Sequence, residues 1–155
     1  MDYIGRKTAK LMLTYRLETE INKPIDEVIR VFRNRDKMAQ WQPGLISSEL
    51  LESEPHPKYK LLMQIGRRKL VMTETILRDE LPLHFEGTYE MRGVYNRIQN
   101  SFEATGGAST RWISVVEFRF KGMMMVIAFF MKDGFRKQSE IIMSNFKRFV
   151  EAGKG

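Results

Sequence analysis

The chain of 155 residues carries 26 Lys and Arg against 19 Asp and Glu, which gives a formal net charge of +7. It contains no cysteine, so disulfides, thiolate metal sites and cysteine nucleophiles are excluded. Hydrophobic residues make up 43% of the chain and charged residues 29%, as in an ordinary globular protein. This length predicts a single domain over residues 1–155, with a core at 10–152.

The positive charge is spread along the chain rather than gathered in one place. The densest basic groups, at 67–69, 136–137 and 147–148, are short and are typical of solvated turns and helix faces. No nucleic-acid partner is therefore expected. The first seven residues lack the apolar core of a secretory signal, and the longest apolar run, 123–131, is about half the length of a membrane-spanning helix. These features predict a cytoplasmic protein.

The first predicted elements are a strand and two short helices. Apolar side chains occupy mainly the odd positions of 11–21, a period of two that is typical of a half-buried strand. Pro24 suits the first turn of a helix, and apolar residues recur at helical spacing as far as Phe32. A second helical segment begins at Asn34 and ends at 41–44, where proline and glycine interrupt it.

Six further strands and one long helix follow. The strands are predicted at residues 45–53, 58–65, 69–78, 83–91, 94–103 and 110–120. Short turns join them, so consecutive strands pair antiparallel. From 122 to about 152 the period becomes helical, and this helix alone is long enough to cover an apolar sheet face. Its apolar stripe is predicted to contain Ile127, Met131, Phe135, Gln138, Ile142, Phe146 and Phe149.

This order of elements resembles the START-like (SRPBCC) superfamily, which includes polyketide cyclases, plant allergen-type carriers and lipid-transfer proteins. The matching stretches are residues 21–28, 41–44, 135–140 and 145–151, and the resemblance covers 10–152. It implies an α+β helix-grip (START/Bet v 1-like) fold. In that fold a bent seven-stranded antiparallel sheet surrounds a long C-terminal helix, and two short helices lie between strands one and two. It also implies a deep cavity between sheet and helix that accepts lipids, sterols, polyketides or hormones.

No sequence motif for catalysis is present. The only histidines are His56, between two prolines, and His84, on the polar side of its strand. A histidine metal site or a Ser-His-Asp triad lacks partners here, and there is no glycine-rich phosphate loop. The sequence therefore predicts no metal and no cofactor.

Polar side chains on otherwise apolar faces are the more informative residues. Glu74, Asn96 and Asn100 share the parity of apolar neighbours in their strands. A buried polar group needs a partner, so these residues, together with Gln138 on the helix stripe, would orient a hydroxyl or carbonyl of a ligand. The alternatives are a register irregularity, a bulge, or hydrogen bonds to one another. For Glu74, the opposite parity of its strand would serve equally well as the inner face.

The predicted cavity combines these polar groups with apolar and aromatic side chains that share their faces. Its residues are Tyr15, Leu17, Met63, Met72, Glu74, Phe85, Tyr89, Asn96, Ile98, Asn100, Trp112, Ile127, Met131, Phe135 and Gln138.

Three functions fit this sequence. The leading hypothesis is binding or transport of a hydrophobic small molecule, such as a lipid, sterol or polyketide-like compound, without catalysis. The alternative is a cyclase or dehydratase without metal or cofactor, in which Glu74 is the candidate for proton transfer. The third is an interaction module that uses the apolar run 123–131, which begins at Met123, against a membrane or in a homodimer.

Overall fold

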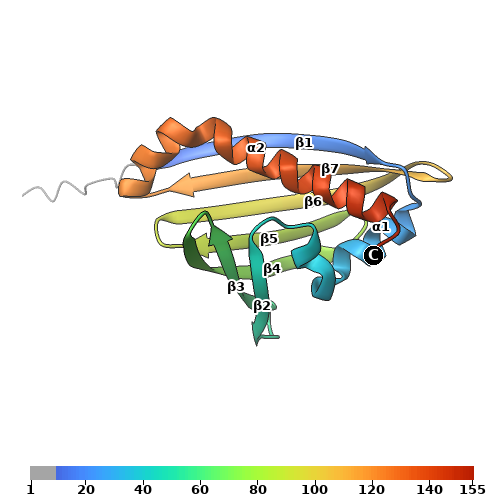
Figure 1. Ribbon diagram of the computed structural model, residues 1–155, viewed down its shortest axis with the longest axis horizontal. Helices are drawn as coiled ribbons and strands as arrows, with labels where there is room; N and C mark the ends of the chain where they lie inside the picture. The colour runs from blue at the N-terminus through green and yellow to red at the C-terminus, as the bar shows by residue number, and fades with distance from the viewer. Residues whose placement is uncertain (1–9) are drawn as a thin grey trace, which may run out of the picture.

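The computed structural model describes residues 10–155, so the first nine residues of the predicted domain lie outside the described part. It contains seven strands and three helical segments (Figure 1). The strands are β1 Leu11–Ile21, β2 Leu45–Glu52, β3 Lys58–Ile65, β4 Arg68–Glu80, β5 His84–Met91, β6 Val94–Gly106 and β7 Ser109–Phe120. The helices are α1 Ile25–Arg33, the 3-10 helix η1 Arg35–Gln40 and α2 Met123–Glu151.

All strands form one antiparallel sheet in the order β1-β7-β6-β5-β4-β3-β2. The chain thus meanders from β2 to β7, and β1 closes against β7 at the far edge. The predicted fold class is confirmed. The second short helix is a 3-10 helix, a form that short connecting segments often take.

The sheet bends strongly, and the helices lie on its concave side. Figure 1 shows β2 and β3 turned steeply away from β1, β7 and β6, while α2 runs along β1 and β7. At 29 residues and ~1.5 Å per residue, α2 is long enough to follow the length of the strands. No helix in the described part of the chain is long and apolar enough to cross a membrane.

One end of the concave face is filled by aromatic side chains. The Phe32 ring of α1 lies 5.1 Å from the Phe102 ring and 5.8 Å from the Phe146 ring, between centroids. Trp112 stacks on Phe102, and Trp41 packs edge-on against Phe146 at 4.8 Å. Since aromatic rings bury much apolar area and favour such geometries, this cluster holds α1 and the second half of α2 on the sheet.

The first half of α2 departs from the predicted stripe. Ile127, Met131 and Gln138 were expected to face the cavity, but all three side chains are exposed. The inner row instead contains Ala128 and Ser139. Because nearly every residue from 123 to 131 is apolar, the periodicity of that run does not distinguish its inner side from its outer side.

Candidate functional site

A pocket of about 460 Å³ opens between α1, η1, the β2–β3 connection and strands β4 and β5. That volume lies within the range of small-molecule sites, ~300–1,000 Å³. The pocket is lined by Phe32, Arg33, Arg35, Met38, Pro55, His56, Pro57, Tyr59, Ile76, Leu77, Arg78, Asp79 and Phe85.

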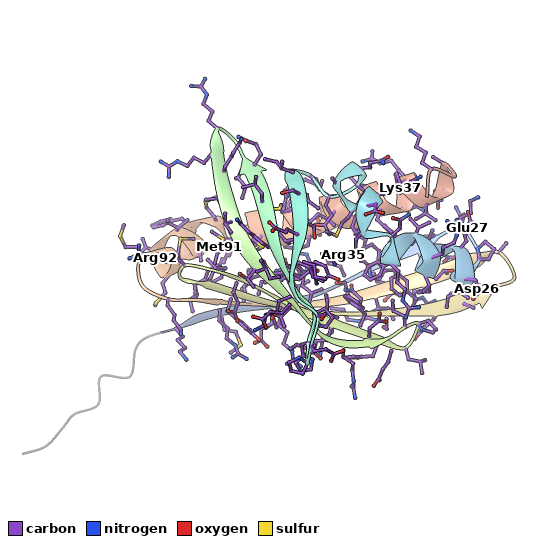
Figure 2. The ribbon with its side chains drawn as sticks, turned by 90° about the horizontal axis from the view of Figure 1, so that it is seen from below. Asp26, Glu27, Arg35, Lys37, Met91 and Arg92 are labelled. Carbon is purple, nitrogen blue, oxygen red and sulfur yellow. The ribbon has the colours of Figure 1, made fainter. Side chains whose placement is uncertain are left out.

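Arg35 is the best-connected charged residue of this pocket. Its guanidinium carbon lies 3.5 Å from the centroid of the Tyr59 ring, a cation–π contact. Its Nη2 donates to the Glu74 carboxylate and, at 2.8 Å, to the Ser48 hydroxyl. Its Nε is buried and has no hydrogen-bond partner in the described structure. Figure 2 shows Arg35 near the middle of the concave side, so this side chain reaches from η1 to the sheet.

Glu74 lies behind Arg35 on β4 and faces inward. Glu74 is only 3% exposed, and its cross-strand neighbours are Tyr59 and Tyr89. The Tyr89 hydroxyl donates to Glu74 Oε1 at 3.0 Å, while Arg35 donates to Oε2. Both carboxylate oxygens are therefore hydrogen-bonded within the protein. The strand pairing is regular at Glu74, so its inward position does not come from a register irregularity.

The buried Tyr89 hydroxyl stays protonated. Burial raises the pKa of Tyr89 well above its usual value, and the neighbouring Glu74 charge raises this pKa further. Arg35, Glu74 and Tyr89 thus form a fixed chain of two donors and one shared acceptor, which we call the concave-face cluster.

The two predicted asparagines have different surroundings. Asn100 accepts a hydrogen bond from Trp112 Nε1 at 2.9 Å, so its side chain belongs to the packed aromatic end. Asn96 lies opposite Tyr89 in the β5–β6 register, and its buried Oδ1 has no hydrogen-bond partner in the described structure. Of the two, Asn96 is the one that retains an unused acceptor beside the concave-face cluster.

Of all the predicted cavity residues, Phe85 alone lines the pocket, and no residue of α2 does, so this pocket does not lie between the sheet and the C-terminal helix as predicted. The Tyr15 hydroxyl bonds to Ser139 Oγ at 2.7 Å and to the Phe135 carbonyl at 3.1 Å, which ties β1 to α2. The Phe135 ring packs 5.0 Å from Phe118. The remaining concave-face residues are half-buried or buried without lining the pocket: Leu17, Met63, Met72 and Ile98.

The sequence analysis did not identify several pocket residues. Phe32 was assigned only to a helix stripe, and Arg35 and Tyr59 were not singled out as site residues. The inward Glu74 was the usable signal, because a buried carboxylate needs a cationic or donor partner. The buried carboxylate indicates that a partner exists, but the sequence does not show which of the 26 basic residues it is.

A second carboxylate cluster lies on the opposite face of the sheet. Glu86 on β5 accepts from Arg97 Nε at 2.6 Å, contacts His84 Nε2 at 3.1 Å and accepts from Gln99 Nε2 at 3.3 Å. The hydrogen bond from Arg97 is the main reason that the pKa of Glu86 is lowered to about 2. None of these residues lines the pocket. Within residues 10–155, no three His, Asp or Glu side chains gather in a way that would hold a metal ion.

Comparison with solved structures shows the same architecture in other proteins. An uncharacterized protein from Rhizobium leguminosarum matches with a TM-score of 0.76 at 15% identity, over 93% of this chain and 97% of that one. The Zhui aromatase/cyclase from a Streptomyces species matches with a TM-score of 0.73 at 12% identity, over 91% and 94%. Truncated norcoclaurine synthase from Thalictrum flavum matches with a TM-score of 0.71 at 12% identity, over 94% and 97%.

No protein-family model and no curated protein matches the sequence. The structural neighbours, which also include the protein Ara h 8.0201 at 16% identity, confirm the predicted helix-grip fold of the START-like type. At such low identity the likeness shows the fold, and function has to be argued from the site.

Proposed function

We propose that the chain binds an amphipathic small molecule, mostly apolar and bearing a hydrogen-bond acceptor, in the pocket between η1 and strands β3 to β5. Phe32, Met38, Ile76 and Phe85 supply an apolar wall that would favour such a ligand by burial. The observation that carries the proposal is Arg35, a cationic side chain that lines this pocket and whose buried Nε has no hydrogen-bond partner within residues 10–155.

The charge of the cluster favours a neutral acceptor. Glu74 already balances Arg35, so a carbonyl or hydroxyl oxygen would accept a hydrogen bond from the Arg35 guanidinium without adding a second buried charge. Sterols and polyketide-like compounds have this composition, since each carries isolated oxygens on an extended apolar skeleton. A lipid with a free ionised carboxylate is less favoured for the same reason.

Native mass spectrometry of freshly purified protein, followed by dye displacement with sterols, polyketide-like aromatics and neutral lipids, tests this proposal. We expect at least one class to bind in a one-to-one complex and to displace a neutral environment-sensitive dye. Absence of binding across the whole panel would reject the proposal.

A pair of variants on β4 locates the site. Ile76→Trp places a bulky side chain in the pocket and should abolish dye binding, whereas Val71→Trp adds the same side chain on the exposed opposite parity of that strand. Equal loss of dye binding in both variants would mean that the dye does not occupy this pocket.

A second candidate function is proton-transfer chemistry on a bound polyketide-like substrate. It is favoured by the hydrogen bond between the buried Glu74 carboxylate and the Tyr89 phenol, and two structural neighbours are an aromatase/cyclase and a synthase. Turnover that disappears in Glu74→Gln even at substrate concentrations that saturate the variant would establish this function. Binding without turnover would reject catalysis and support the non-catalytic binding function.

A further inference from the structure

The first turns of α2 present a continuous apolar face to the outside. Met123, Val126, Ile127, Phe130 and Met131 are all exposed, and Met123 and Phe130 are exposed to 84% and 80%. Their spacing of i, i+3, i+4, i+7 and i+8 places them on one side of the helix. We call these five residues the α2 apolar face.

This face is separate from the side by which α2 packs on the sheet. Ala128, which is 1% exposed, marks the inner side of the same turns. Nothing in residues 10–155 covers the α2 apolar face, whereas the second half of the helix buries Phe146 and Phe149 in the core. A contiguous exposed apolar patch of this kind marks an interaction surface.

Basic side chains lie at both ends of the α2 apolar face. The exposed Lys121 comes just before the helix, Lys137 lies seven residues after Phe130 on the same side of α2, and Arg92 comes from the β5–β6 turn. The Lys121 N–H donates to the Gly93 carbonyl at 2.9 Å, which holds that turn beside the start of α2, as Figure 2 shows for Arg92. Among residues 10–155 these three cations form no ion pair, and Asp133 is the only acidic residue between 121 and 139.

We propose that the α2 apolar face docks on the surface of a bilayer that contains anionic lipids. An amphipathic helix with aromatic and aliphatic residues on one side and cations beside them lies in the interface plane, with its apolar side at the boundary of headgroups and acyl chains. Arg92, Lys121 and Lys137 then lie at the level of the anionic headgroups. This surface is distinct from the ligand pocket, so the inference goes beyond the proposed function.

The charge of the rim distinguishes a bilayer from a second copy of the chain. Face-to-face contact of two copies would bring two sets of unpaired cations together, in a chain that already carries +7. An anionic membrane surface is complementary to the same rim.

Sedimentation of the full-length chain with phosphatidylcholine vesicles, with and without phosphatidylglycerol, tests the proposal. We expect binding that requires phosphatidylglycerol and weakens as salt is added. The double variant Met123→Glu, Phe130→Glu should lower the partition coefficient at least about tenfold, because it removes two apolar anchors and adds repulsion. Leu83→Glu is the matched control, since Leu83 is 79% exposed in the β4–β5 connection, and it should bind as the wild type does.

The rim is tested separately. Arg92→Gln with Lys137→Gln should lower binding to phosphatidylglycerol vesicles by about tenfold and leave the circular dichroism spectrum unchanged. Absence of wild-type binding to anionic vesicles would overturn the proposal, and so would equal binding by the Met123, Phe130 double variant. Light scattering that shows a dimer which this double variant dissociates, without vesicle binding, would assign the face to a second copy instead.

Discussion

Glu74 and Glu86 lie on neighbouring strands, are both nearly buried, and each accepts a hydrogen bond from an arginine, yet they face opposite sides of the sheet. Glu86 takes its partners from strands β5 and β6, within the sheet itself. Glu74 takes Arg35 from η1, 39 residues earlier in the chain and in another layer. The outer pair therefore braces adjacent strands, whereas the inner pair joins the helical layer to the sheet.

The two arginines also differ in the surroundings of their unused hydrogen-bond donors. Arg97 lies on the outer face and its side chain is 36% exposed, so water can accept hydrogen bonds from the donors that Glu86 does not use. Arg35 has a buried Nε with no partner and lies on a pocket wall. A buried donor without a hydrogen-bond partner costs free energy unless a ligand or water accepts from it. Arg35 is therefore suited to binding a ligand, whereas Arg97 forms a structural ion pair.

The largest expected effect comes from removing the inner arginine. Arg35→Met leaves the 3% exposed Glu74 carboxylate without its charge partner, which should lower the free energy of unfolding by about 3 kcal/mol. Arg97→Met, its counterpart on the outer face, should cost only about 1 kcal/mol because the pair is partly solvated. Urea denaturation compares the two variants. Equal losses would remove the distinction between the pairs, and adding Glu74→Gln to Arg35→Met should restore part of the stability.

Tyr89→Phe removes the donor to Glu74 Oε1 and should lower the free energy of unfolding by about 1–2 kcal/mol at neutral pH. Because the pKa of Tyr89 is raised in the folded state above the unfolded value of 10.0, the protonated phenol stabilises the fold below pH 10. That stabilisation is lost as the pH rises above 10. Unfolding measured from pH 8 to 11 should show a smaller alkaline loss in Tyr89→Phe than in the wild type; parallel curves would contradict the raised pKa.

Ligand binding should respond to one carboxylate and not to the other. Glu74→Gln releases Arg35 from its fixed position and should weaken dye or ligand binding by about tenfold, the equivalent of one lost hydrogen bond to a charged group. Glu86→Gln changes the same functional group on the outer face and should leave the affinity unchanged. Dye titration of both folded variants checks this. A similar loss of affinity in both would mean that the concave-face cluster does not contribute to ligand binding.

The smallest expected effect is the stability change in Glu86→Gln. This substitution should lower the free energy of unfolding by about 1 kcal/mol at pH 7, after allowance for solvent around Arg97. The pKa of Glu86 falls from 4.5 to about 2 on folding, so its stabilisation is present above pH 4.5 and is lost as the pH falls toward 2. The gap between wild type and variant should close over that range. A constant gap in acid unfolding curves would contradict the assignment.

The fold was predictable because local signals agreed with it along the chain. The period of two over β1, the proline before α1 and the glycine turns between strands each specify an element or its end. The parity of Glu74 and Asn96 allowed an inward face without deciding it, since for Glu74 the opposite parity of its strand fitted equally well.

Two parts of the site could not be predicted, for physical reasons. Arg35 lies in a six-residue 3-10 segment, too short to show a period, and its contact with Glu74 depends on the bend of the sheet. In the run 123–131 nearly every residue is apolar, so the sequence did not show that Ile127 and Met131 point outward. Gln138 was misplaced for another reason: both Gln138 and Ser139 lie at helical spacing from Phe135 and Ile142, and the inner row continues through Ser139.

A crystal structure of the protein purified without delipidation tests the central claim most directly. The account predicts density for a bound molecule in the pocket between Phe32, Tyr59 and Phe85, with an oxygen atom within hydrogen-bond distance of the Arg35 guanidinium. A pocket closed by its own side chains, with Arg35 Nε bonded inside the protein, would contradict it.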